Sequence, residues 1–154
     1  MAKLELICVG DLKFPALKEL EAHYLKRIAH FSKLSTRVIK DFKIKEEEQK
    51  KKKEGEAMMA LVEPRDFVVA LDEKGKNLSS LEFARFLDQK LSYHPGRTLF
   101  LVGGHAGLHP QVLHRADYKL SFSPMTFAHD MFRIIFLEQL YRAFTINKGI
   151  TYHR

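Results

Sequence analysis

Short apolar runs typical of buried β-strands alternate with longer segments of helical periodicity along the whole chain. We predict strands over residues 4–9, 36–42, 67–71, 98–102 and 118–122, and helices over residues 15–31, 46–62, 79–91, 110–115 and 129–145. This alternation indicates an α/β fold, with a mostly parallel sheet and helices on both of its faces. Because the chain shows no internal repeat and no Pro/Ser-rich linker, we expect a single domain over residues 1–154.

Local sequence signals predict the start of one helix and the end of one strand. Ser79 and Glu82 form the S-x-x-E pattern of a capping box, which predicts the start of a helix. Gly75 predicts a turn over residues 72–76, directly after the third strand.

The charge balance favours a polyanionic partner. The net charge is +7, and nucleic acid is a common polyanion that attracts such a surface, although a soluble basic protein could carry the same charge. The only cysteine, Cys8, lies in the first apolar run, and a single thiol there indicates an inert core residue in a reducing compartment. With no signal-peptide pattern and no apolar run of membrane-spanning length, we expect a cytoplasmic protein without membrane contact.

A run of four lysines at residues 50–53 follows three glutamates at residues 46–48. The spacing allows three i,i+4 pairs, Glu46–Lys50, Glu47–Lys51 and Glu48–Lys52, which favours a solvated helix face. The alternative is an edge that contacts phosphate groups.

Two predicted strands end in turns suited to a ligand. One runs into Gly103-Gly104-His105-Ala106-Gly107, where glycines allow close backbone approach. The other runs into residues 122–127, which offer hydroxyl groups and apolar side chains, and Leu71-Asp72 marks a third strand end. Ligands of α/β folds lie at the carboxyl ends of strands, so the three ends predict one pocket. The glycine spacing matches neither a dinucleotide fingerprint nor a P-loop.

The last predicted helix, residues 129–145, is apolar on nearly all sides. Such a helix must be covered on several sides, which favours a partner subunit. Its exceptions include Glu138 and Arg142, whose i,i+4 spacing predicts a structural ion pair.

Four segments together resemble the ribosomal RNA large-subunit methyltransferase H family, the small single-domain SPOUT methyltransferases. They read VGGHAGL at residues 102–108, LSFSPMTFAH at 120–129, EQLYRA at 138–143 and YHR at 152–154. The resemblance implies an α/β-knot fold with a deep C-terminal trefoil knot, S-adenosylmethionine as cofactor, and a homodimer. It also implies methylation of the position-3 nitrogen of a pseudouridine in large-subunit ribosomal RNA, with the assembled ribosome as substrate and no metal.

The resemblance assigns cofactor binding to the three strand ends. The residues that it implies are Leu71, Gly103, Gly104, Gly107, Phe122, Ser123, Pro124, Met125, Thr126 and Phe127. Two positions depart from the family pattern, Ala128, where many members have Pro, and Ala106, where Glu or Asn is more usual. Neither change removes a reactive group.

The ring nitrogen must lose a proton, so a general base or a stabilised anion is expected. The candidate bases are His129, His153 and Tyr152, with Arg142 or Arg154 to balance charge on the ring carbonyls. We hypothesise that the tail 152–154 of one subunit reaches the pocket of the other, since its side chains suit RNA stacking and phosphate contact. For His129, helix capping is the competing role. His105 and His109 are spaced i,i+4, but no further ligands complete a metal site.

Two other functions are compatible with parts of the pattern. A non-catalytic ribosome-binding or assembly module would share the basic surface without needing the pocket turns. A nucleotide-dependent oxidoreductase would share the sheet, but the missing fingerprint argues against it.

Overall fold

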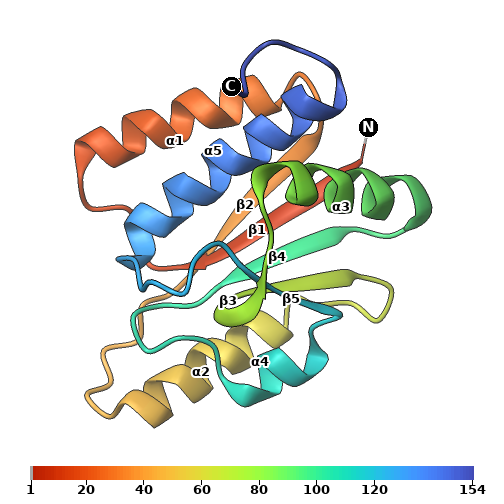
Figure 1. The fold of residues 1–154 in the computed structure, drawn as a ribbon. Coiled ribbons are helices and arrows are strands. Elements are labelled where there is room, and N and C mark those ends of the chain that lie inside the picture. The colour runs from red at the N-terminus through yellow and green to blue at the C-terminus, as the bar shows by residue number, and fades with distance from the viewer. Residues whose placement is uncertain (1) are drawn as a thin grey trace.

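The computed structural model describes residues 2–154 and contains a five-stranded parallel sheet (Figure 1). The strand order is β2-β1-β4-β3-β5, and every neighbouring pair is parallel. The strands are β1 (Lys3–Val9), β2 (Lys33–Ile39), β3 (Phe67–Asn77), β4 (Thr98–Val102) and β5 (Tyr118–Ser121). The predicted α/β class with a parallel sheet is confirmed.

Helices cover both faces of this sheet (Figure 1). One face carries α1 (Pro15–Ile28), α3 (Ser80–Tyr93) and α5 (His129–Asn147), and the other carries α2 (Glu47–Met59) and α4 (Pro110–Arg115). The capping box at Ser79 is present: its hydroxyl accepts from the Glu82 amide at 3.1 Å, and Glu82 accepts from the Ser79 amide at 2.7 Å.

Successive side chains of the central strands point to opposite faces of the sheet and contribute to a hydrophobic core on each face. Leu6 and Cys8 of β1 pack under α3 and α5, whereas Ile7 and Val9 pack under α2 and α4. Every residue of β4 is buried, as expected of an apolar strand in a parallel sheet covered on both faces. Burial raises the pKa of the Cys8 thiol to about 12, so this cysteine is a core residue and not a nucleophile.

Strand β3 does not stop where the predicted turn begins. It continues through residues 72–76, so the turn prediction is wrong. Leu71 and Lys76 both pair with Leu120, which means that the intervening residues bulge out of the ladder. A Cβ on Gly75 would lie 2.7 Å from the Lys119 carbonyl carbon, so this glycine serves close strand approach.

Strand β2 also differs, because it spans Lys33–Ile39 and not residues 36–42. It is an edge strand with alternating exposed polar residues, and this makes its apolar signal weak. Helix ends differ by smaller amounts: α1 and α2 end at Ile28 and Met59, and α5 continues to Asn147.

Elements of the same chain pack against much of the surface of α5. The helix packs between α1, α3 and the sheet, and its buried residues include Phe136, Leu137 and Leu140. Arg133 is buried as well, with its Nε 2.5 Å from a carboxylate oxygen of Glu21 on α1. The helix is therefore covered on several sides, as expected, and most of this cover comes from its own chain; Met131 is its large exposed apolar side chain.

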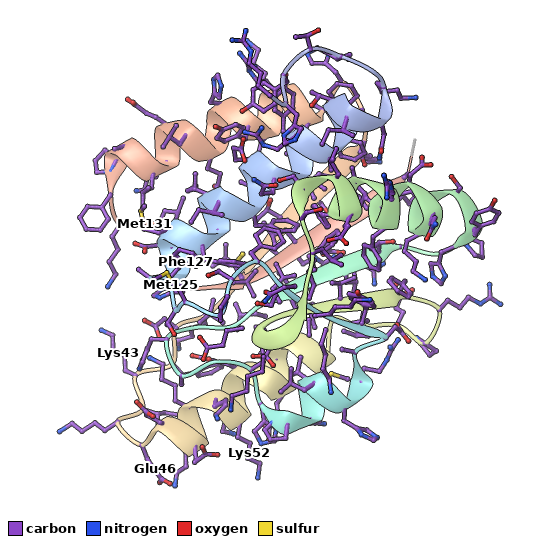
Figure 2. The ribbon with its side chains drawn as sticks, in the orientation of Figure 1. Lys43, Glu46, Lys52, Met125, Phe127 and Met131 are labelled. Carbon is purple, nitrogen blue, oxygen red and sulfur yellow. The ribbon has the colours of Figure 1, made fainter. Side chains whose placement is uncertain are left out.

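The three predicted glutamate–lysine pairs of α2 do not form. Lys50 is buried and forms an ion pair with Asp41 at 2.7 Å. Lys51 pairs with Glu48, three residues earlier, at 3.3 Å. Lys52 does face solvent, as do Lys43 and Glu46 in the segment before it (Figure 2). The prediction of a solvated helix face is thus correct for only part of the lysine run.

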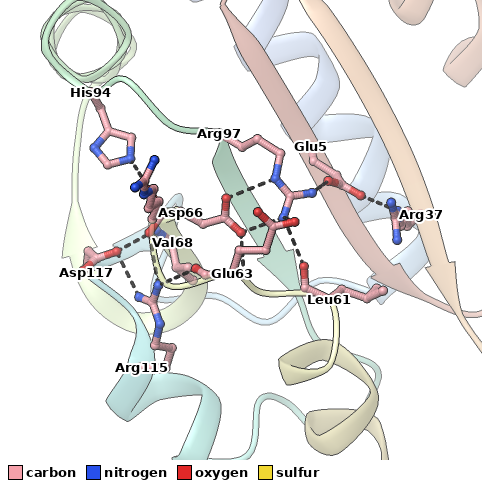
Figure 3. Close-up of polar contacts among 11 residues, drawn as sticks. Glu5, Arg37, Leu61, Glu63, Asp66, Val68, His94, Arg97, Arg115 and Asp117 are labelled. Carbon is pink, nitrogen blue, oxygen red and sulfur yellow. Dashed lines mark hydrogen bonds and ion pairs between the residues drawn. The ribbon is translucent and has the colours of Figure 1, made fainter.

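A polar network ties the start of β4 to its surroundings (Figure 3). The Arg97 guanidinium contacts Glu5 at 2.6 Å and Asp66 at 2.7 Å, and donates to the Leu61 carbonyl at 3.2 Å. A second guanidinium, that of Arg37, lies 2.6 Å from Glu5. Both carboxylates are almost fully buried, so they depend on these partners.

Among residues 2–154, no helix is both long enough and apolar enough to cross a membrane.

Candidate active site

A cavity of about 230 Å³ opens where β4 and β5 end, beside residues 71–73 in the middle of β3. Its walls come from these residues of β3, the turn after β4 at residues 103–108, residues 121–127 at the end of β5 and beyond it, and the first turn of α5. The three segments predicted to form one pocket therefore lie together, although Leu71 and Asp72 lie within β3 and not at its end. Nine of the ten predicted cofactor residues line this cavity: Leu71, Gly103, Gly104, Gly107, Phe122, Ser123, Met125, Thr126 and Phe127. Pro124 does not line it.

The first turn needs glycine at two positions. A Cβ on Gly103 would lie 2.7 Å from the Gly107 carbonyl carbon, closer than side-chain atoms approach a backbone. Gly107 has a φ of +83°, a region that side chains disfavour, and its amide donates to the Gly104 carbonyl at 3.0 Å. The glycines thus close a tight turn whose backbone forms one wall of the cavity.

We expect Gly103→Val to weaken binding of S-adenosylhomocysteine, the demethylated product of the implied cofactor, by roughly a hundredfold, because its side chain would push the turn apart. Isothermal titration calorimetry measures this effect. Gly149→Ala is the matched control: this glycine also has a positive φ, +65°, but it does not line the cavity. Equal weakening by both variants would show that the effect is not local to the turn.

The second turn is held by its own serines and by aromatic packing. Ser121 Oγ donates to the Ser123 carbonyl at 2.9 Å, and the Met125 amide donates to Ser123 Oγ at 3.0 Å. The Phe122 ring packs against the rings of Phe83 and Phe132, with centroids 5.6 Å and 5.4 Å away. These contacts fix the turn at its base.

Two apolar side chains that line the cavity stay exposed: Met125 is 73 % exposed and Phe127 39 % (Figure 2). Met131, in the first turn of α5, is 48 % exposed but does not line the cavity. The mouth therefore presents apolar surface to any molecule that covers it.

Two carboxylates lie in the cavity wall, of which the sequence interpretation named Asp72 with the third strand end and missed Glu73. Asp72 and Glu73 line the cavity because the bulge in β3 carries them toward it. Glu73 accepts a hydrogen bond of 2.6 Å from Thr126 Oγ1, which joins the β3 bulge to the second turn. The available signal was a second acidic residue after a buried apolar run, but Glu73 was assigned only to a turn.

A second polar cluster lies at the other end of α5. Arg142 pairs with Glu138 at 2.5 Å, which confirms the predicted ion pair, and Tyr152 donates to Glu138 at 3.0 Å. The Arg142 guanidinium lies 4.8 Å from the centre of the Tyr152 ring and 3.0 Å from Nδ1 of His153. The tail is thus folded onto its own helix.

Burial and the hydrogen bond to Glu138 raise the pKa of Tyr152. Its hydroxyl therefore keeps its proton and donates, which disfavours Tyr152 as a base. Since a guanidinium only donates, His153 Nδ1 must accept, and the ring proton lies on Nε2. In this arrangement His153 can donate a further hydrogen bond but cannot take up a proton at Nε2.

Within a single chain, the cavity and the polar cluster around Arg142 lie apart. His129 and Phe132 line the cavity from the start of α5, whereas Arg142 lies ten residues beyond Phe132, about 15 Å along the helix. Arg142, Tyr152, His153 and Arg154 do not line the cavity. Of the candidate catalytic residues, only His129 does, and it is exposed there, while Ala128 occupies the cap position of α5.

The glycine turn and the second turn, both at the carboxyl edge of a parallel sheet, invite comparison with known families. The model of a family described as "Predicted SPOUT methyltransferase" matches residues 2–153. The chain belongs to the SPOUT methyltransferase family. This confirms the family predicted from the four sequence segments.

Two relatives extend the SPOUT assignment. A protein of Carboxydothermus hydrogenoformans is 44 % identical over 158 aligned residues, which cover 99 % of each chain. A protein of Christiangramia forsetii is 41 % identical over 153 aligned residues, covering 97 % of this chain and 98 % of its own. Both are named ribosomal RNA large subunit methyltransferase H. Residues 2–154 contain no group of three or more His, Cys, Asp or Glu suited to a metal ion.

Proposed function

We propose that this protein transfers a methyl group from S-adenosylmethionine to the position-3 nitrogen of a pseudouridine in large-subunit ribosomal RNA, within the assembled ribosome in the cytoplasm. The observation that carries the proposal is the cavity between the two turns, in a chain of a methyltransferase family. The names of the relatives support ribosomal RNA as the substrate class. The net charge of +7 suits a polyanionic partner.

The lining residues fit this donor. Leu71 and Phe122 offer apolar surface for the adenine, and the backbone of residues 122–127 offers hydrogen-bonding groups at its edge. Asp72 and Glu73 place carboxylates where the donor, which carries positive charge, would enter. The proposal includes a deep trefoil knot in the C-terminal half, which would bring the two turns together.

The donor supplies, when bound, a methyl group that is electrophilic because it is attached to a sulfonium. The task of the protein residues is alignment of the two reactants and exclusion of water. The glycine turn and residues 122–127 hold one reactant, and such positioning can lower a barrier by roughly 7–11 kcal/mol. The exposed apolar side chains of Met125 and Phe127 would keep water from the mouth once RNA covers it.

The target nitrogen must also release its proton. His129 is the candidate base, since it lines the cavity and is open to solvent. Arg154 and His153 would stabilise the negative charge that develops on the ring carbonyls, because both can donate hydrogen bonds. Arg142 is assigned to positioning, since Glu138 and His153 already engage its guanidinium.

A homodimer would unite the two clusters. Because the tail of one chain is remote from its own cavity, we infer that it serves the cavity of the partner subunit in a composite site. The exposed apolar side chains at the cavity mouth are suited to such a contact.

Transfer of a tritiated methyl group to intact ribosomes, followed by mass mapping of the RNA, tests this function. We expect label on one pseudouridine of the large-subunit RNA, and more label on intact ribosomes than on free large subunits. Binding to ribosomes without transfer would favour the non-catalytic assembly module instead.

A further inference from the structure

Glu54 is a buried carboxylate without a partner. Its residue is 2 % exposed, and both oxygens lack a hydrogen bond within the described chain. The other buried atoms without hydrogen bonds belong to Glu5, Glu21 and Arg133, and all of these side chains are held in ion pairs. Within residues 2–154 neither oxygen of Glu54 has an ion-pair partner, although an isolated buried charge is costly.

This carboxylate lies directly behind the glycine turn. Its two oxygens are 3.2 Å and 3.3 Å from the point where a Cβ of Gly104 would stand. The neighbouring residue, Gly55, packs against His109, which follows the turn, since a Cβ on Gly55 would lie 2.9 Å from the His109 Cβ. Gly104 lines the cavity but Glu54 does not, so Glu54 contacts the far side of the cavity wall.

The groups that face Glu54 leave its two acceptors unused. Lys50, one turn earlier on α2, is bound to Asp41 at 2.7 Å. His105 belongs to the turn itself, and the amides of His105 and Ala106 donate no hydrogen bond within the described residues. Burial raises the pKa of Glu54, while Lys50 and His105 oppose the rise and Asp41 adds to it.

We propose that Glu54 is a positioning residue. It contacts the glycine turn on the side remote from the cavity and stabilises the conformation of the turn that binds the methyl donor. The inference rests on the proposed function of the cavity. A small displacement of the turn when the donor binds would bring an amide or the imidazole of this turn onto the carboxylate. Glu54 then stabilises the bound shape of the turn, at the cost of lower stability for the free protein.

Glu54→Gln tests this role, because it keeps the size of the side chain and removes its charge. We expect the variant to bind S-adenosylhomocysteine about tenfold more weakly in calorimetry, since a charge-assisted hydrogen bond is replaced by a neutral one. Without ligand, its melting temperature at pH 8 should equal or exceed that of the wild type. Glu56→Gln is the matched control, since Glu56 is an exposed carboxylate on the same helix.

The pH dependence supplies a second readout. The raised pKa of Glu54 means that its ionisation opposes folding, so wild-type stability is lost as pH rises through that pKa. The stability advantage of Glu54→Gln should therefore disappear below the ordinary glutamate pKa of 4.5. Affinity for S-adenosylhomocysteine should rise with pH more steeply in the wild type than in Glu54→Gln. This difference isolates Glu54, because both proteins retain Asp41, Lys50 and His105.

The possible results separate the inference from the function beneath it. Wild-type affinity in Glu54→Gln, with an unchanged pH profile, would overturn the inference and leave the proposed function intact. Parallel loss of stability and affinity would assign Glu54 to folding only, which also overturns it. A wild-type protein that fails to bind S-adenosylhomocysteine would overturn the proposed function itself.

Discussion

Removal of Tyr152, His153 and Arg154 is expected to lower methyl transfer to ribosomes by about a thousandfold and to leave S-adenosylhomocysteine binding unchanged. The tail does not line the cavity of its own chain, so donor binding does not need it. It carries the imidazole and guanidinium assigned to the charge that develops on the target nucleobase, and loss of one such donor typically costs roughly 10²–10³ in rate. Labelled-methyl transfer and calorimetry on the truncated protein measure the two quantities separately.

Mixed dimers decide from which subunit the tail acts. The truncated chain keeps an intact cavity, whereas Gly103→Val keeps an intact tail. The assay is run at a donor concentration that saturates the wild type but leaves Gly103→Val largely unbound. If each tail serves the partner's cavity, equal mixing of the two proteins should then restore about one quarter of the wild-type activity, because half of the dimers hold one complete site. No restored activity, with mixed dimers verified by mass, would refute the composite site.

Replacement of Arg97 by methionine is expected to destabilise the fold by about 3 kcal/mol, near the lower end of the range for breaking a buried ion pair. The loss of the guanidinium leaves Asp66 without its ion pair, and Glu5 retains only Arg37. Urea unfolding measures the change as a lower midpoint at constant slope.

The control for Arg97 is Arg85→Met, which removes an exposed charge from α3. We expect it to change stability by less than about 0.5 kcal/mol. Similar effects of the two substitutions would mean that the network in Figure 3 adds nothing beyond net charge. The cavity lies at the opposite ends of the strands, so a folded Arg97→Met protein should bind the donor normally.

The order of elements and the place of the cavity were predictable from local features of the sequence. Continuous apolar runs indicate strands that are buried on both sides, as in β4, and glycines after such a strand indicate a close turn. The Glu138–Arg142 pair was predictable because both partners lie one helical turn apart. All of these features depend on neighbours in sequence.

What the sequence did not reveal depends on contacts between distant segments. Gly75 reads as a turn residue until β5 is placed beside it, and the bulge that carries Glu73 to the cavity follows from that pairing. Lys50 was assigned to solvent because its partner, Asp41, precedes the helix. Glu54 was not distinguished from the charged residues around it, since its burial appears only when α2 packs against the glycine turn.

The most direct test of the central claim is calorimetric titration of the full-length protein with S-adenosylhomocysteine. The two turns that wall the cavity are predicted to bind one molecule per chain, and Gly103→Val is predicted to weaken that binding strongly while Gly149→Ala leaves it unchanged. A folded wild-type protein with no measurable affinity for S-adenosylhomocysteine or S-adenosylmethionine would contradict the assignment of this cavity as the donor site.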